Sequence, residues 1–375
     1  MRANGETTQT ERPLFHILPR GMNFSRAKAS SIDLFVSEVA AHSRFPIEIV
    51  AEFSAPALPA KVIHALPTYR LAETHLRARF VAELAQAEKP RLLIVQQHLP
   101  TAAAICARVE APVLLQRHNF LRPPRPGLWG SVFRARHTRQ LDALAGLTFV
   151  SEIARNDFER DWPEVKTPRW VVTNGVDCAD WRGAEPREPL VLVVGRATPE
   201  KGLLEAAEAL AAVLPENPAW AAAFVIAGAK CGGAYFDQVQ AALAPLQTRA
   251  KIFTDIPFAE VKAFNERAAI AVIPSKWREP FGRTCLEAFA GGAAVITSGS
   301  GGLSEIAGDA ALLTPEVTTP KITEALRVLI GDEGLRRRLG GEGRARAEAM
   351  FNLPRVAAKL DDVCETILAR STSAK

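Results

Sequence analysis

The chain has 375 residues, of which 48% are hydrophobic and 23% charged, and a formal net charge of +5. This is the composition of globular protein, and the length suffices for two domains with full cores. No stretch of about 18 apolar residues occurs, which argues against a membrane-spanning helix. The polar segment 1–12 has no apolar core, so we expect a flexible start and no signal peptide.

Short β-rich runs alternate with helical patterns along almost the whole chain, which is typical of parallel sheets with crossover helices. In the first half the expected strands are Leu14–Leu18, Ile47–Phe53, Leu92–Gln96, Val113–Gln116, Leu147–Val150 and Trp170–Thr173. In the second half they are Leu190–Gly195, Phe224–Ala227, Lys251–Phe253, Ile270–Ile273, Ala294–Thr297 and Ala311–Leu313. The pattern predicts an α/β protein with two doubly wound domains.

The two halves are separated by a turn signal at Asn174–Asp177 and a segment rich in proline, glycine and charge at Arg182–Pro189. We therefore expect a flexible N-terminus over 1–12, a first domain over 13–180 and a second domain over 181–353. Residues 354–375 should form a helix that packs back on the first domain. Ligands of such sheets bind at the carboxyl ends of the strands, so two facing domains would form a central cleft.

Two cations follow the first strand of the second half. Arg196 comes directly after Gly195, and Lys201 lies just before Gly202. At the carboxyl end of a strand these cations would be able to neutralise a diphosphate leaving group, whereas the alternative is a solvated loop with surface charges. A later strand is followed by the turn Gly299–Gly302, which indicates either a close backbone approach or a plain tight turn.

The segment Glu279–Glu287 combines two carboxylates with the start of a helix. Pro280 and Gly282 are poor helix-interior residues, so the helix should begin near Arg283. The free N–H groups of such a helix start bind phosphate. Because Glu279 would precede this anion site and Glu287 would lie one turn inside the helix, we expect the two carboxylates to bracket a ligand.

Three strings carry a family resemblance: Ile273–Gly282, Leu286–Val295 and Gly301–Ile306. Together with Arg196–Lys201 and Asn174–Asp177, they resemble glycosyltransferase family 4, most strongly over residues 147–313. The resemblance implies the GT-B fold, with two Rossmann-like domains. It also implies a UDP- or GDP-linked sugar donor held mainly by the second domain, and transfer with retention of the anomeric configuration.

By position, the resemblance implies roles for single residues. Arg196 and Lys201 resemble the diphosphate-binding pair, Glu279 the carboxylate at the donor sugar, and Glu287 the residue that holds the ribose hydroxyls. The diphosphate and sugar would be contacted by the backbone near Phe281, Gly282, Arg283 and Thr284. We therefore expect Arg196, Lys201 and Glu279 to be catalytic, together with His118 of the first domain.

In the first domain, His118 follows the strand Val113–Gln116 and resembles a histidine that many relatives place over the donor sugar near the acceptor. We expect it to position the acceptor or sugar through hydrogen bonds and not to act as a general base; a structural histidine is the alternative. Gly21 stands where the family usually has a Gly-Gly turn that lines the diphosphate, and it matches that turn with one glycine.

The motifs contain no divalent-metal site, because there is no Asp-x-Asp and the adjacent Asp361 and Asp362 fall in the terminal helix. We therefore expect no metal and no cofactor, and metal-independent transfer. The five cysteines are scattered without metal-ligand or redox spacing, so we read them as reduced thiols of a cytoplasmic protein.

An arginine-rich stretch free of acidic residues runs from Ala111 to Leu141. Arginines beside exposed aromatics suit an anionic membrane or a phosphorylated lipid-linked glycan, whereas a charge run is more commonly a solvated face. We expect an acceptor or membrane surface formed by Arg117, Arg122, Arg125, Trp129 and Arg134, with peripheral contact at the cytoplasmic face of the inner membrane. No nucleic-acid fold signature is present, so we do not expect a nucleic-acid partner.

The sequence therefore favours a retaining hexosyltransferase that acts on a glycan or lipid-linked acceptor in bacterial lipopolysaccharide or surface polysaccharide biosynthesis. A catalytically silent nucleotide-sugar-binding or scaffold protein of the same fold is the alternative. A nicotinamide oxidoreductase would need a complete Gly-x-Gly-x-x-Gly after a first strand, which is missing.

Overall fold

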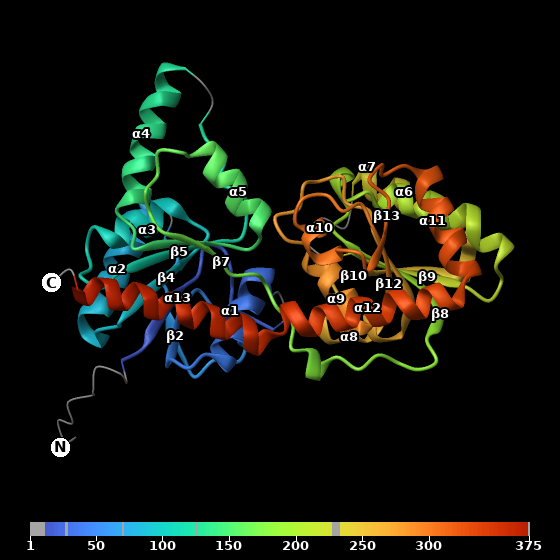
Figure 1. The fold of residues 1–375 in the computed structure, drawn as a ribbon, viewed down its shortest axis with the longest axis horizontal. Coiled ribbons are helices and arrows are strands. Elements are labelled where there is room, and N and C mark those ends of the chain that lie inside the picture. The colour runs from blue at the N-terminus through green and yellow to red at the C-terminus, as the bar shows by residue number, and fades with distance from the viewer. Residues whose placement is uncertain (1–11, 27–28, 70, 125–126, 227–232, 374–375) are drawn as a thin grey trace. The chain divides into compact units, whose positions relative to one another are not determined.

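The computed structural model describes residues 12–26, 29–69, 71–124, 127–226 and 233–373 (Figure 1). The chain divides into two compact units. Unit 1 consists of Met1–Asn174 and Leu353–Lys375, and unit 2 of Gly175–Asn352. Within the described ranges, no helix has the length and apolar character needed to cross a membrane.

Unit 1 contains a parallel sheet in the strand order β3-β2-β1-β4-β5-β6-β7. Its strands are β1 (Leu14–Ile17), β2 (Ile47–Ala51), β3 (Val62–Ala65), β4 (Leu92–Gln96), β5 (Val113–Arg117), β6 (Gly146–Phe149) and β7 (Arg169–Val171). Each strand expected from the sequence is present. The sequence pattern missed β3, an edge strand whose two end residues are exposed and therefore lack the apolar run of a buried strand.

Alternate residues of these strands bury the two faces of the sheet. Leu14 and Leu92 belong to one hydrophobic core, and their neighbours Phe15 and Leu93 to another, because successive side chains of a strand point to opposite faces. The first core is completed by α1 (Ser31–His42) and α13 (Leu353–Ser373), and the second by α2 (Glu73–Glu88), α3 (Leu99–Cys106) and α5 (Glu152–Asp161). Another helix, α4 (Leu128–Asp142), buries Leu141 near its C-terminal end.

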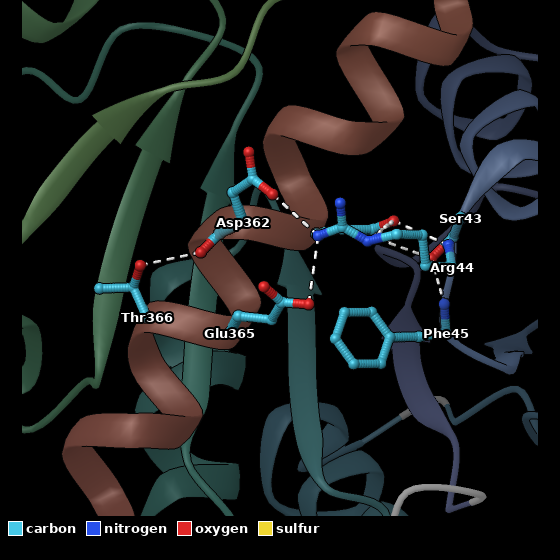
Figure 2. A network of polar contacts seen from close by, with 7 residues as sticks. Ser43, Arg44, Phe45, Asp362, Glu365 and Thr366 are labelled. Atoms are coloured by element: carbon cyan, nitrogen blue, oxygen red, sulfur yellow. Dashed lines mark hydrogen bonds and ion pairs between the residues drawn. The ribbon is translucent and has the colours of Figure 1, made fainter.

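The C-terminal helix α13 is fixed to unit 1 by a polar cluster as well as by its apolar face. The buried Asp361 carboxylate accepts hydrogen bonds from Ser43 Oγ and from the Arg44 backbone N–H, both at 2.7 Å. Figure 2 shows the Arg44 guanidinium between Asp362 and Glu365, at 2.8 and 3.2 Å. These contacts join α13 to the segment that follows α1.

Unit 2 contains a second parallel sheet, in the order β10-β9-β8-β11-β12-β13. Its strands are β8 (Glu188–Gly195), β9 (Ala221–Ile226), β10 (Ala250–Thr254), β11 (Ala268–Ile273), β12 (Ala294–Thr297) and β13 (Ala311–Leu313). Its helices are α6 (Leu203–Val213), α7 (Ala234–Leu243), α8 (Phe258–Arg267), α9 (Arg283–Gly291), α10 (Gly302–Ala307), α11 (Thr319–Gly331) and α12 (Glu333–Phe351). Short 3-10 turns lie at Cys178–Asp180, Pro199–Lys201, Leu214–Glu216 and Ala244–Arg249.

The division between the units lies at Asn174/Gly175, within the boundary segment expected from the sequence and before the expected end of the first domain at 180. The reason is that the residues after Asn174 are bound to the end of α12. Val176 N–H donates to the Phe351 carbonyl at 3.0 Å, and Cys178 N–H to Asn352 Oδ1 at 3.2 Å. The second division lies at Asn352/Leu353, one residue before the expected position.

Candidate functional site

The candidate site residues of unit 2 follow three neighbouring strands, β8, β11 and β12. Arg196 and Lys201 follow β8, the segment Ser275–Gly282 follows β11, and Gly299–Gly302 follows β12. The strands are parallel, so their carboxyl ends share one edge of the sheet. The fold therefore gathers these three segments at the edge where doubly wound sheets bind ligands.

The loops after β8 and β11 are held together through their backbones. The N–H groups of Lys276 and Trp277 donate to the Glu200 carbonyl, at 2.9 and 3.0 Å. Gly202 has a φ of +67°, and a Cβ there would overlap the Pro274 carbonyl oxygen. Glycine is required at this position for both reasons. The close approach fixes Lys201 beside the second loop.

Lys201 and Glu279 form an ion pair between Lys201 Nζ and Glu279 Oε1. The same carboxylate oxygen accepts a hydrogen bond from Ser275 Oγ at 2.8 Å. The Lys201 and Glu279 side chains retain 19% and 13% exposure, so the pair is accessible at the edge of the sheet. Sequence reasoning did not select Ser275, although a hydroxyl two residues after a buried strand is a detectable signal.

The backbone of Glu279 is bound on its other side by the glycine turn after β12. Glu279 N–H donates to the Ser300 carbonyl at 3.3 Å, and Gly302 N–H donates to the Glu279 carbonyl at 2.7 Å. A Cβ at Gly302 would lie 2.7 Å from Phe281 Cα, which is closer than packed atoms allow. The expected close backbone approach at this turn is confirmed.

Helix α9 begins at Arg283, as predicted. Its N-cap residue, Gly282, has a φ of +112° and no side chain that could cap the helix. Phe281 is buried with its ring edge-on to Phe351 at 5.8 Å, so this residue can offer a ligand only its backbone. Thr284, in the first turn, is half-buried.

Glu287 lies one turn inside α9 and is 5% exposed. Its Oε1 is paired with Arg283 Nε at 2.8 Å, the i,i+4 spacing of one helical turn. Arg196, by contrast, is exposed directly after β8. Unit 2 therefore presents Arg196, Lys201 and the start of α9 as positive charge, with Glu279 and Glu287 as the two carboxylates.

In unit 1, the half-buried His118 belongs to a polar chain at the carboxyl ends of β4 and β5 that leads to the buried Gln96 and His16. Its Nε2 lies 2.7 Å from Gln96 Oε1, and its backbone N–H donates to Gln97 Oε1 at 2.9 Å. Gln96 Nε2 in turn lies 3.3 Å from His16 Nδ1. Because an amide oxygen only accepts hydrogen bonds, His118 carries a proton on Nε2.

Burial lowers the pKa of His118 to about 3, with a smaller contribution from the nearby Arg117 and His16. Burial also lowers the pKa of His16 to about 4. His118 is therefore a neutral hydrogen-bond donor at physiological pH. Gly21, after β1, is exposed with a φ of +71°, and a Cβ there would meet no atom of the described residues within 4 Å.

Burial removes Arg117 from the expected acceptor or membrane surface, and Arg134 lies on that surface only in part, with its side chain 36% exposed. Arg117 is buried, because its guanidinium donates to the backbone carbonyls of Gln97 and Phe120. Arg134 Nε is paired with Glu164 Oε1 at 2.6 Å and therefore holds α4 to the segment after α5. Arg122 and Trp129 are exposed as expected, and Arg125 lies outside the described residues.

A cavity of about 790 Å³ lies in unit 1 at the segments that follow β1 and β4. Its lining includes four arginines and one carboxylate: Arg20, Arg77, Arg108, Arg136 and Glu73. Gln97, which binds the His118 backbone, also lines it. A larger hollow of about 1150 Å³ includes residues at the C-terminal ends of α2 and α13 and residues before β1, β4 and β5, away from the carboxyl edge.

Within the described ranges, no three or more His, Cys, Asp or Glu side chains gather as a metal site would require. The adjacent Asp361 and Asp362 fix α13 to unit 1.

Residues 180–346 match the family model described as glycosyl transferases group 1. The chain carries a group 1 glycosyl transferase domain. This glycosyl transferase domain falls within unit 2, and it contains Arg196, Lys201, Glu279 and Glu287.

Curated relatives are similar over most of the chain. Alpha-maltose-1-phosphate synthase from Mycolicibacterium smegmatis is 27% identical over 256 residues, covering 61% of this chain and 65% of its own length. The lipopolysaccharide core biosynthesis mannosyltransferase LpcC from Rhizobium leguminosarum bv. viciae is 28% identical over 284 residues, covering 69% of this chain and 76% of its own.

The chain also resembles a solved structure, that of Anabaena HepE in complex with UDP. The TM-score is 0.75 at 16% identity, over 95% of this chain and 100% of HepE. This likeness is one of fold, and it confirms the predicted GT-B class of two Rossmann-like α/β domains. The central cleft expected between them stays a prediction.

Proposed function

We propose that this group 1 glycosyltransferase is a retaining enzyme of glycosyltransferase family 4 that moves a hexose-type sugar from a nucleotide-diphosphate sugar to a glycan or lipid-linked acceptor. The main observation in support of this proposal is the accessible Lys201–Glu279 ion pair, which lies at the carboxyl edge of the unit 2 sheet next to the start of α9. UDP in the structure of HepE and the mannosyltransferase name of LpcC support a nucleotide-sugar donor.

The donor diphosphate would bind at the start of α9, where the backbone N–H groups of the first turn and the helix dipole favour an anion. Arg196 is exposed after β8 and supplies a guanidinium for the same group. Glu287, held by Arg283 one turn further along, would accept hydrogen bonds from the ribose hydroxyls. The donor would be a UDP- or GDP-linked sugar.

Lys201 would exchange partners when the donor binds. In the free protein its ammonium is paired with Glu279. A diphosphate carries more negative charge than one carboxylate and would draw the ammonium toward itself, which leaves Glu279 for the donor sugar. As the anomeric C–O bond to the diphosphate breaks, Lys201 and Arg196 stabilise the negative charge of the leaving group. Glu279 orients the sugar and faces its developing positive charge.

Two side-chain cations and a helix start supply the positive charge that the leaving diphosphate needs. For this reason we propose that the transfer is independent of a divalent metal and needs no cofactor. Recovery of lost activity by magnesium or manganese after treatment with a chelator would contradict this part of the proposal.

The acceptor would bind in unit 1. The cavity at the carboxyl edge of its sheet is lined by four arginines, of which Arg20 and Arg77 are paired with Glu73, and Arg77 also with Glu52. The other two, Arg108 and Arg136, would supply the charge for an acceptor with an anionic group. His118 is neutral and directs its one ring proton, on Nε2, to Gln96, so it would position the acceptor or sugar by accepting a hydrogen bond at Nδ1. We place the enzyme in the cytoplasm, in peripheral contact with the inner membrane, where lipopolysaccharide or surface polysaccharide is assembled.

The test begins with thermal-shift titrations against UDP- and GDP-sugars, followed by donor hydrolysis and transfer assays on the sugars that bind. We expect a nucleotide sugar to raise the melting temperature and to be turned over. Binding without turnover in the wild type would instead assign a catalytically silent nucleotide-sugar-binding protein. Binding of no nucleotide sugar would contradict both functions.

A further inference from the structure

Helix α4 has one face that is fixed to unit 1. Arg134 Nε pairs with Glu164 Oε1 and its Nη2 donates to the Asp161 carbonyl, both at 2.6 Å. Thr138 Oγ1 donates to the same glutamate at 3.1 Å, and Leu141 is fully buried. At 3.6 residues per turn, these positions lie on one side of the helix.

The opposite side of α4 carries large apolar side chains in contact with solvent. Leu128 is 81% exposed, Trp129 74%, Val132 52% and Phe133 48%. Leu128 and Val132 lie about 140–180° around the helix from Leu141. Figure 1 shows α4 projecting from the rest of unit 1, with its first turn at the tip. These four side chains, termed the α4 tip, therefore form an exposed apolar patch at the end of a projecting helix.

Two exposed arginines stand behind the tip on the same side of α4. Arg136 lies three residues after Phe133 and four after Val132, and Arg139 lies one turn further along the helix. With a rise of 1.5 Å per residue, the arginines are about 5–10 Å behind the last apolar residue of the tip. The chain has no acidic residue from Ala111 to Leu141, so no carboxylate of this helix before Asp142 offsets them.

This order of side chains matches the layers of a membrane surface. Apolar side chains of an interfacial helix enter about 5–10 Å into the boundary between headgroups and acyl chains. Arginines at the following turns would then lie at the level of the lipid phosphates, and their charge complements anionic lipid. A tryptophan is well suited to this boundary because its ring is both apolar and polar.

We propose that the α4 tip inserts into the surface of an anionic bilayer, with Arg136 and Arg139 bound to lipid phosphates. The inference deepens the proposed peripheral contact but does not depend on the proposed sugar transfer. Arg136 also lines the basic cavity of unit 1. If that cavity takes the acceptor, as proposed above, the inserted α4 tip would hold the cavity beside the membrane in which a lipid-linked acceptor resides.

The experiment is flotation of the full chain with vesicles of phosphatidylcholine alone or with added phosphatidylglycerol. We expect flotation with the anionic vesicles and weak or no flotation with the neutral ones. The double substitution Trp129→Ser, Phe133→Ser should lower the floated fraction at least about tenfold, because it removes the inserted aromatic rings. The matched control is Leu71→Ser, since Leu71 is an 83% exposed apolar residue of unit 1 outside α4, and it should float like the wild type.

A second variant separates the charge from the apolar tip. Replacement of Arg136 and Arg139 by glutamine should weaken binding to anionic vesicles by about fivefold per arginine and reduce its sensitivity to salt. Circular dichroism should show unchanged folding. Donor hydrolysis should be unchanged in the Trp129→Ser, Phe133→Ser protein, which shows that the α4 tip acts in membrane binding and not in the reaction.

Undiminished flotation of the tip variant would overturn the proposal. So would a wild-type protein that fails to float but sediments as a dimer, with the dimer lost in the same variant. In that case the α4 tip would bind a second copy of this chain.

Discussion

Lys201 and Glu279 are 78 residues apart in the sequence, yet they form an ion pair at the carboxyl edge of the unit 2 sheet. Two pairs of backbone hydrogen bonds maintain it: one pair binds the loop of Lys201 to the loop after β11, and the other binds Glu279 to the glycine turn after β12. The pair is thus a product of three strands whose carboxyl ends are adjacent. This arrangement leads to predictions for the site and for the two units that carry it.

Lys201→Ala should lower donor turnover by about 10²–10³-fold, because it removes a positive charge aimed at the leaving diphosphate. The measurement is steady-state hydrolysis or transfer with the nucleotide sugar that binds. Lys276→Ala is the matched control: Lys276 is on the same loop as Glu279, but its ammonium is paired with Glu205. Equal losses in the two variants would contradict a specific role for Lys201.

Gly302→Ala should destabilise unit 2 by about 1–3 kcal/mol, because the added Cβ would be forced against Phe281 Cα. The displaced backbone also carries Glu279, so turnover should fall with stability. Gly341→Ala tests the same chemical change on the exposed surface of α12, where a Cβ meets no described atom within 4 Å. That control should stabilise the protein by about 0.5–1 kcal/mol in urea unfolding.

Asp361→Ala should destabilise unit 1 by about 1–3 kcal/mol, since it removes a buried carboxylate and leaves the Ser43 hydroxyl and the Arg44 N–H without their acceptor. Asp362→Ala removes the neighbouring carboxylate, which is 67% exposed, and should change the stability little. Urea unfolding followed by circular dichroism compares the two. A loss of the same size for both variants would mean that Asp361 does not determine how α13 is held.

Stability should fall on acidification because of His118. Its pKa is about 3 in the folded protein and near the ordinary 6.5 when unfolded. Between these values the unfolded chain binds a proton that the folded protein does not, so unfolding becomes easier as the pH falls from about 6.5 toward 3. His118→Gln lacks this titration and should lose less stability than the wild type between pH 7 and pH 5. An identical loss would contradict the neutral His118.

Much of the fold could be predicted because parallel strands buried on both faces are continuous apolar runs, such as Leu92–Gln96 and Ala268–Ile273. The start of α9 at Arg283 was also predictable, because Pro280 and Gly282 exclude an earlier helix. Strand β3 was not, since it lies at the edge of the sheet with both end residues exposed.

The site could be predicted only as separate segments. The order of residues indicated cations after β8 and carboxylates around α9, but the Ser275 contact and the binding of Gly302 to Glu279 depend on strands brought together by the fold. For the arginine-rich stretch from Ala111 to Leu141, the sequence indicated more exposed positive charge than the fold presents. Its composition could not reveal that Arg117 is buried and bonds to backbone carbonyls or that Arg134 is paired with Glu164, so the exposed and unshared positive charge of the stretch is smaller than its arginine content indicates.

The most direct test of the account is the kinetics of Glu279→Gln together with the anomeric configuration of the product, followed by proton NMR from the start of the reaction. From an α-linked donor, the first product should be the α-anomer. The substitution should depress turnover far more than donor affinity, because Glu279 acts on the sugar while Arg196, Lys201 and α9 hold the diphosphate. A β-anomer as first product, or equal losses of turnover and affinity in Glu279→Gln, would contradict the account.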